Sequence, residues 1–267
     1  MVGLGNMLGG RGGATMGILF AVVMNMGAYW FSDKIALKMS RAQPVTEAEA
    51  PDLYRMVRNL CARAGLPMPS LHVIPSEQPN AFATGRDPNH AAVAVTDGIT
   101  KLMSAEELEG VLAHELAHVK NRDILITSVA ATIAGAISWV ATIARWGAFF
   151  GSSDDDDGGG LAGVLVATIV APIAALIIQM AISRSREFEA DHDGAEIAGR
   201  PDGLASALAK IETYARRSPM PVNPAASSLF IINPLGGGLA HGIGRWFMTH
   251  PPTEERIARL QEMAITG

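Results

Sequence analysis

The sequence contains one cysteine, Cys61, among 267 residues, so no disulfide can form within the chain. It also lacks the paired cysteines that hold a metal or a redox centre. Charge is scarce as well, because 18% of the residues are charged against about 25% in an average soluble domain. The net charge of −5 gives no basic surface for nucleic acid. We therefore expect a reducing compartment, no nucleic-acid partner and segments that do not face water.

The scarcity of charge is concentrated in three runs that contain no Asp, Glu, Lys or Arg. They comprise 18, 21 and 22 residues, at 14–31, 124–144 and 161–182. About 20 apolar residues are needed to cross the hydrocarbon core of a bilayer. Tyr29 and Trp30 close the first run with the aromatic residues that are typical of a membrane interface. These runs predict three transmembrane helices and a lipid bilayer as partner.

The segments between these runs differ in character. Residues 1–13 are rich in glycine and predict a flexible lead-in, and residues 151–160 form an acidic, glycine-rich loop. The two long polar segments, 33–122 and 183–267, carry ten and nine of the 21 Lys and Arg residues. Because basic residues collect on the cytoplasmic side, both polar segments are expected to face the cytoplasm.

Hydrophobic periodicity predicts an α+β protein that is predominantly helical. The pattern over 46–64 favours a helix that stops at Gly65, and the runs 71–74 and 91–96 have the character of strands. Further helices are expected near the C-terminus, over 183–199, 201–216 and 253–263.

His114 and His118 belong to a His-Glu-Leu-Ala-His motif. Upstream, Ser104 with Glu107 three residues later forms a capping box, which places the motif well inside a helix. Histidines at positions i and i+4 project from one helix face and can bind one Zn²⁺ at about 2.1 Å. Glu115 is offset from that face and can accept a proton from a water beside the metal. The motif therefore predicts a catalytic zinc site with Glu115 as general base.

A third protein ligand is needed beside two histidines and a water. Glu187 and Asp191 are four residues apart in an expected helix and so share a face. One can bind zinc while the other accepts the remaining N–H of a zinc-bound histidine. Glu189 points elsewhere, since two residues turn a helix through about 200°. Small residues favour close contact of the two helices, namely Gly110, Ala113, Ala117, Ala190, Gly194, Ala195 and Ala198.

The other histidines are less informative. His250 precedes two prolines and a helix that carries Arg256. It could donate a hydrogen bond to the oxyanion that forms on a scissile carbonyl, and fixing the loop is the competing interpretation. Structural roles are expected for His72, His90, His192 and His241.

Three other functions fit the sequence less well than a surface zinc protease. An intramembrane protease would carry the motif within an apolar run, whereas charged residues flank it at 106–109 and 120–123. A structural zinc site usually has four protein ligands, and three are found here. A zinc transporter would need polar ligands inside the uncharged runs, which offer Asn25 and Gln179 beside hydroxyl groups.

Four motifs together closely resemble those of the bacterial heat-shock protease family HtpX, which comprises integral-membrane zinc metalloproteases. These motifs are residues 80–85, 113–123, 183–191 and the His-Pro-Pro with Arg-Ile at 250–257. The resemblance extends from about Gly9 to Leu260, and the family is related to the CAAX prenyl proteases. Its members usually have another hydrophobic segment before the glycine-rich stretch, whereas residues 1–8 alone precede that stretch here.

The resemblance implies a zincin-like, thermolysin-like protease domain on the cytoplasmic side of a bacterial inner membrane. It implies one Zn²⁺ per chain, with Glu187 as third ligand and Asp191 supporting a histidine. Damaged or misassembled membrane proteins and unfolded proteins would be the substrates, in protein quality control under stress. An extended substrate would add to a strand at the edge of the active site. The expected substrate contacts are Asn80, Ala81, Phe82 and Arg256.

Overall fold

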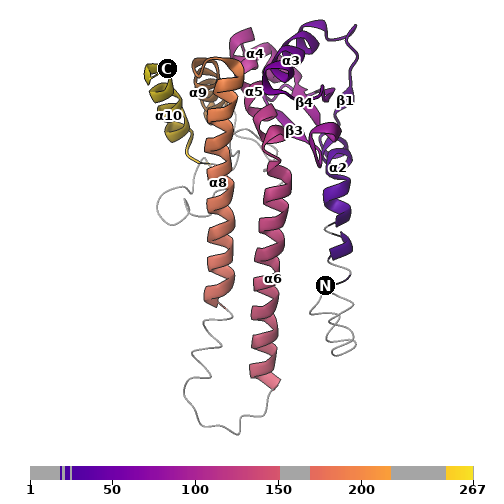
Figure 1. Cartoon of the computed structure of the whole chain (residues 1–267), viewed down its shortest axis with the longest axis vertical. Helices are drawn as coiled ribbons and strands as arrows, with labels where there is room; N and C mark the ends of the chain where they lie inside the picture. Colours follow the sequence, from indigo (N-terminus) through magenta and orange to yellow (C-terminus); the bar gives the residue numbers. More distant parts are fainter. Residues whose placement is uncertain (1–18, 20–21, 25, 151–168, 218–250, 267) are drawn as a thin grey trace. The chain divides into compact units, whose positions relative to one another are not determined.

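The computed structural model describes residues 19, 22–24, 26–150, 169–217 and 251–266 (Figure 1). The predicted flexible segment 1–13, the acidic loop 151–160 and His250 lie outside the described residues. The chain divides into two compact units, one formed by Met1–Tyr29 with Ile126–Ile182 and the other by Trp30–Leu125 with Ser183–Gly267.

The second unit contains a small mixed sheet of four strands in the order β1-β2-β4-β3. The strands are β1 (Gln43–Pro44), β2 (Ser70–Ile74), β3 (Ala81–Thr84) and β4 (Ala92–Thr96). Strand β2 runs parallel to β4, and β3 pairs antiparallel with β4. Within this sheet β3 pairs with β4 alone, so β3 is an edge strand.

Helices make up most of the remaining described structure. They are α2 (Ser32–Met39), α3 (Pro51–Ala64), α4 (Asp97–Leu102), α5 (Ala105–Lys120), α6 (Asp123–Phe150), α8 (Ala171–Ala198), α9 (Asp202–Arg217) and α10 (Thr253–Thr266), with the short 3-10 helix η1 (Pro88–His90). Helices α6 and α8 each have residues in both units. The prediction of a predominantly helical α+β protein is confirmed.

The sheet has an apolar core on each face. Alternate residues of a strand point to opposite faces, and Leu71, Ala81, Val93 and Val95 pack against residues of α3, α5 and α9. On the other face Ile74, Phe82 and Ala94 pack against Ala36 of α2. Strand β3 therefore lies between the helix that carries the histidine motif and the cluster under α2.

Helix α3 is shorter than predicted, because it begins at Pro51 and not at residue 46. The backbone N–H and the hydroxyl of Thr46 both donate to the Glu49 carboxylate at 2.7 Å, which holds these residues in a turn. Proline is well suited to the first turn of a helix, where its missing N–H has no partner to lose. The predicted stop is confirmed, because Gly65 ends the helix with a left-handed φ of 68°.

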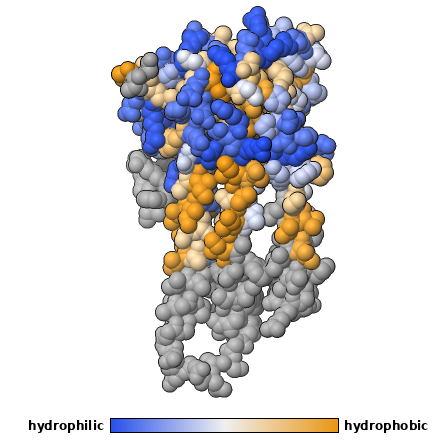
Figure 2. All heavy atoms as spheres, in the orientation of Figure 1, coloured by the Kyte–Doolittle hydropathy of each residue, from blue (hydrophilic) through white to orange (hydrophobic). Residues whose placement is uncertain are grey.

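The first unit exposes large apolar side chains, and Figure 2 shows hydrophobic residues gathered on its described part. These side chains include Val22, Val23, Ile133, Ile169, Val170, Ile173 and Ile178. Among the described residues, no helix is both long enough and apolar enough to cross a membrane. The three membrane segments expected from the sequence stay predictions.

Candidate metal centre

Helix α5 presents both histidines of the motif inside the protein. The predicted capping box is confirmed, because Ser104 and Glu107 each bond the backbone N–H of the other. The His114 side chain is almost fully buried, with 2% of the residue exposed. The two imidazole rings are nearly perpendicular, at 83°, and their Nε2 atoms lie 3.1 Å apart. Two potential ligand atoms therefore converge on one point.

Glu187 on α8 completes a set of three. Its carboxylate oxygens lie 3.7 Å from Nε2 of His114 and 3.8 Å from Nε2 of His118. All three ligand atoms lie within 4.8 Å of one another. Ligands about 2.1 Å from a tetrahedral zinc are separated by roughly 3.4 Å, so these separations suit one ion.

Close packing of α8 on α5 brings Glu187 to the histidines. A Cβ atom at Gly194 would lie 2.8 Å from Cα of His114, which is closer than real Cβ contacts allow. Glycine at this position therefore permits the approach of the two helices. The small residues in the sequence predicted this contact, and at Gly194 the prediction is confirmed.

Each histidine has a carboxylate on its second ring nitrogen. Nδ1 of His118 lies 2.6 Å from Oδ2 of Asp123. Nδ1 of His114 lies 3.0 Å from Oδ1 of Asp191, at an angle outside ideal hydrogen-bond geometry. A carboxylate beside Nδ1 holds the proton there and leaves the lone pair on Nε2. When neither Nε2 carries a proton, two lone pairs 3.1 Å apart repel each other unless a cation lies between them, so this donor set fits a metal ion.

An arginine supports each of these carboxylates. Arg256 on α10 donates from Nε and Nη2 to Asp191 at 2.8 and 2.7 Å, and the residue is 1% exposed. Its Nη1 also lies 3.4 Å from the Glu187 carboxylate. On α8, Arg186 donates from Nε to Asp123 at 2.5 Å. The site thus contains two His–Asp–Arg chains.

The charges around the rings shift the pKa values of their neighbours. Burial has the largest effect on His118 and lowers its pKa, but the hydrogen bond that its Nδ1–H donates to Asp123 and the charges of Glu187 and Glu115 outweigh burial and raise the pKa to about 9. Burial likewise raises the pKa of Asp191, yet Arg256 and His114 together lower it to about 2. Surplus negative charge next to two imidazoles is a favourable electrostatic setting for a divalent cation.

Glu115 is held by the edge strand. Its Oε2 accepts a hydrogen bond of 2.8 Å from the backbone N–H of Ala83 in β3, and the residue is 7% exposed. This bond fixes one carboxylate oxygen and orients the other. The helix that carries the histidines and the edge strand of the sheet are therefore joined at the residue predicted to act as base.

The residues predicted to contact substrate lie in two places. Asn80, Ala81 and Phe82 are buried at the start of β3, next to the strand residue that bonds Glu115. Arg256 is buried against Asp191 and Glu187. Their contacts with a substrate stay predictions, as does the role of His250, which lies outside the described residues.

Sequence reasoning did not single out Asp123 or Arg186. Asn121 ends α5, and Arg122 adopts a left-handed φ of 55°, so the chain turns before α6 begins at Asp123. This turn brings the carboxylate back to His118, five residues earlier. The position of Asp123, an acidic residue shortly after the end of the helix that carries the histidines, is the sequence feature that could have indicated this contact.

The match with known proteins covers most of the chain. Residues 47–264 match peptidase family M48. The chain belongs to this family. Over 269 residues it is 56% identical to a protease HtpX homolog from Pelotomaculum thermopropionicum, covering 99% of this chain and 94% of that protein. A second protease HtpX homolog, from Desulfatibacillum aliphaticivorans, is 56% identical over 260 residues, or 96% of this chain and 83% of that protein.

These relatives confirm the resemblance to the HtpX proteases, and the chain is a metallopeptidase of family M48. Its fold is also similar to the crystal structure of Ste24p from S. mikatae, with a TM-score of 0.59 and 21% identity. That alignment covers 91% of this chain, which spans 56% of the Ste24p chain. The M48 chain and Ste24p therefore share a fold.

Proposed function

We propose that this M48 peptidase is a zinc-dependent endopeptidase of the bacterial inner membrane that cleaves misfolded or damaged membrane proteins. One observation carries the catalytic part of the proposal. The Nε2 atoms of two histidines on α5, the helix that also carries Glu115, converge on one point with the Glu187 carboxylate of α8. Each of the two rings has a carboxylate beside its Nδ1. Such a set of ligands and a nearby base is typical of metal-assisted hydrolysis, whereas contact between two helices does not require it.

His114, His118 and Glu187 would hold one zinc ion per chain. Three protein ligands leave an open position, as catalytic zinc sites do, whereas structural sites usually have four. When bound, zinc would polarise the scissile carbonyl and lower the pKa of a water molecule to about 7. Asp123 and Asp191 would keep the two Nε2 lone pairs directed at the ion.

Glu115 would act as the general base. The N–H of Ala83 binds its Oε2, and Oε1 makes no hydrogen bond within the described part of the chain. Oε1 can therefore accept the proton of the attacking water and later return it to the leaving amine. His250 would donate to the oxyanion on the scissile carbonyl.

An extended substrate would lie along β3. An exposed sheet edge offers backbone N–H and C=O groups to a second strand, and Ala81 and Phe82 lie in this edge strand, with Asn80 just before it. Because unfolded segments are extended and folded domains are not, this mode of binding favours damaged or misassembled proteins.

The membrane location rests on the uncharged runs and on the exposed apolar side chains of the first unit. The distribution of Lys and Arg favours the cytoplasm for the peptidase unit. Resistance of the chain to extraction from membranes by alkaline carbonate is the expected result. Release into the soluble fraction would contradict the membrane location and leave the peptidase proposal intact.

Replacing Glu115 by Gln tests the catalytic proposal. Glutamine keeps the shape of the side chain and loses the basic oxygen, so cleavage of unfolded casein by the full chain should fall by at least a factor of about 100. Zinc content should stay at one ion per chain. The exposed Glu47→Gln variant serves as control and should cleave normally. Equal cleavage by the parent and Glu115→Gln would refute Glu115 as base.

A further inference from the structure

A cavity lies on the face of the sheet opposite the metal centre. Its volume is about 350 Å³, within the range of small-ligand pockets. Residues from the end of α2, the ends of β2 and β4, and the start of β3 line it, including Met39, Arg41, Ile74, Asn80, Phe82 and Thr96. All of these belong to the same compact unit.

Two residues of the cavity lining, Asn80 and Phe82, belong to the edge strand or directly precede it. Thr96 N–H donates to the Asn80 carbonyl at 2.9 Å, so the backbone of Asn80 faces β4. The backbone hydrogen-bonding groups of successive strand residues point to opposite sides of the strand. The backbone N–H and C=O of Phe82 therefore also face β4, while those of Ala81 and Ala83 point away from the sheet. The bond from Ala83 N–H to Glu115 confirms this alternation.

A substrate strand would pair with Ala81 and with the carbonyl of Ala83, whose N–H already bonds Glu115, and its side chains would alternate between the two faces of the sheet. Residues directly opposite in an antiparallel pair point to the same face, with Cβ atoms about 5 Å apart. Ala81 points toward α5, whereas Phe82 points toward α2 and the cavity. The substrate residue opposite Phe82 would therefore direct its side chain toward this cavity, within about two residues of the peptide bond beside Glu115.

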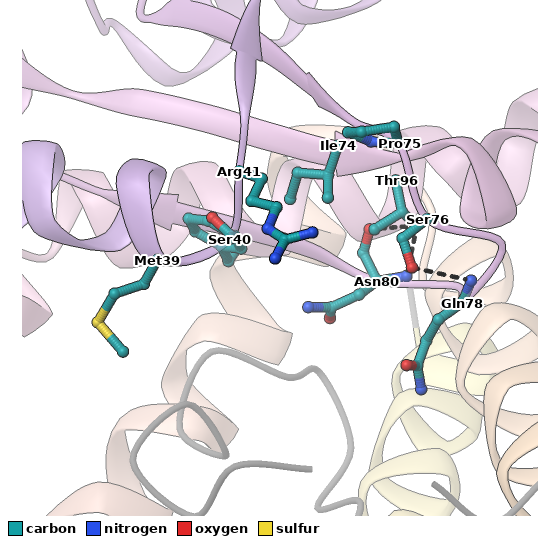
Figure 3. Close-up of a pocket in the computed structure, with 10 residues that line it drawn as sticks. Met39, Ser40, Arg41, Ile74, Pro75, Ser76, Gln78, Asn80 and Thr96 are labelled. Atoms are coloured by element: carbon teal, nitrogen blue, oxygen red, sulfur yellow. Dashed lines mark hydrogen bonds between the residues drawn. The ribbon is translucent and has the colours of Figure 1, made fainter. Parts of the chain in front are cut away.

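The cavity combines an apolar floor with one cation. Met39, Ile74 and Phe82 supply the apolar surface, and none of the described lining residues is acidic. Figure 3 shows the guanidinium of Arg41 and the carboxamide of Asn80 extending into the same space. Arg41 forms no ion pair among the described residues. An apolar stem that ends in a carboxylate matches this lining, because a guanidinium binds carboxylates through charge-assisted hydrogen bonds.

The backbone conformation of Arg41 also supports a role for its side chain. Arg41 follows the end of α2 and adopts a left-handed φ of 56°, a conformation in which glycine or asparagine is favoured. Its N–H bonds the Lys38 carbonyl at 3.3 Å, which ends the helix. A long cationic side chain kept at such a position costs backbone strain. Such strain supports a role for the Arg41 side chain at the cavity.

We propose that this cavity is a substrate side-chain subsite in which Arg41 selects glutamate. The inference rests on the proposed function, because it assumes a peptide strand on β3. It adds a specificity that neither the metal centre nor the edge strand supplies. An anionic lipid headgroup is the other ligand that the Arg41 guanidinium could bind, and peptides of different charge distinguish it from a glutamate side chain.

The test uses internally quenched peptides that the full chain cleaves at one bond. Each of the three positions on either side carries Glu, Gln or Lys in turn. At one position the parent should prefer Glu over Gln by about two- to fivefold in kcat/KM, the range for an exposed charge pair. Arg41→Asn, which suits the left-handed backbone, should bring that ratio to about one. Arg41→Lys should retain the preference for Glu in part.

Arg55→Gln on α3 is the matched control, since Arg55 and its partner Asp52 are both exposed and neither lines the cavity. It should keep the parent's ratio. An unchanged ratio in Arg41→Asn overturns the subsite. So does a loss of activity that is equal for all peptides and occurs only with anionic vesicles, which would indicate a lipid headgroup. If Glu115→Gln cleaved the peptides as well as the parent, the proposed function itself would fail.

Discussion

The buried guanidinium of Arg256 forms two hydrogen bonds to the carboxylate of Asp191, and that carboxylate lies 3.0 Å from Nδ1 of His114. A residue near the C-terminus thus reaches His114, a proposed metal ligand 142 positions earlier in the chain. The Asp191 carboxylate is buried, and its charge is balanced by this arginine. Helix α10 therefore contributes to the candidate metal centre through Arg256.

Replacement of Arg256 by Met should destabilise the protein strongly. It would leave the Asp191 carboxylate buried beside Glu187 without its cation, which costs about 3–5 kcal/mol for a broken buried pair. Arg256→Lys restores the charge without the two-pronged geometry and should recover part of the loss. Chemical unfolding measures both. Equal stability of Arg256→Met and the parent would contradict this role.

Asp123→Asn should weaken zinc binding by about 10- to 100-fold, because the negative partner of His118 Nδ1 is lost while its shape is kept. Competition with a chelator of known affinity measures the change. Asp52→Asn, at an exposed position on α3, is the matched control and should bind zinc like the parent. An Asp123→Asn variant with parental affinity would exclude a positioning role for Asp123.

Gly194→Ala should separate α8 from α5. The added Cβ would meet the backbone of His114 at 2.8 Å, so Glu187 would move away from the histidines. We expect lower stability and loss of zinc in the same variant. At Gly135 in α6 a Cβ would meet nothing within 4 Å, and Gly135→Ala should be neutral or stabilise by up to about 1 kcal/mol. Zinc retention in Gly194→Ala would contradict the close contact.

Acid should weaken the fold through Glu107. Burial alone would raise its pKa, but bonds from Lys210, Ser206 and the Ser104 N–H outweigh this and lower the pKa to about 2, below the ordinary 4.5. Because the pKa of Glu107 is lower in the folded state, its ionisation stabilises the folded state at pH values above the unfolded-state pKa of about 4.5. This stabilisation is lost as the pH falls from about 4.5 to about 2.

The corresponding measurement is the free energy of unfolding with zinc removed by a chelator. Between pH 6 and pH 3 the advantage of the parent over Glu107→Gln should shrink by on the order of 2 kcal/mol. An advantage that is constant over this range would show that Glu107 does not titrate as expected.

Local features of the sequence were sufficient for the core of the site. The capping box and the i, i+4 spacing of His114 and His118 depend on one helix, and the structure has both. The pairing of Glu187 with Asp191 also follows from helix geometry. The choice between them as ligand came from the family resemblance, and Glu187 is the one that lies with the two Nε2 atoms.

Features that depend on distant contacts were less accessible. The partnership of Arg256 with Asp191 joins α10 to α8, and nothing in local periodicity indicates it. Strand β3 has the pattern Ala-Phe-Ala-Thr, too short for a period to stand out, and its edge position depends on the sheet order. The cavity beside Arg41 requires three strands and α2 together.

The most direct test of the metal centre compares Glu187→Ala with Glu189→Ala in the purified full chain. Glu189 lies two residues away on α8, with half of its side chain exposed and paired with Arg186, so it is a matched control. Zinc content and casein cleavage are measured together. We predict that Glu187→Ala loses both, while Glu189→Ala keeps one zinc per chain and its activity. Zinc retained in Glu187→Ala, or lost in Glu189→Ala alone, would contradict the assignment of Glu187 as the third ligand.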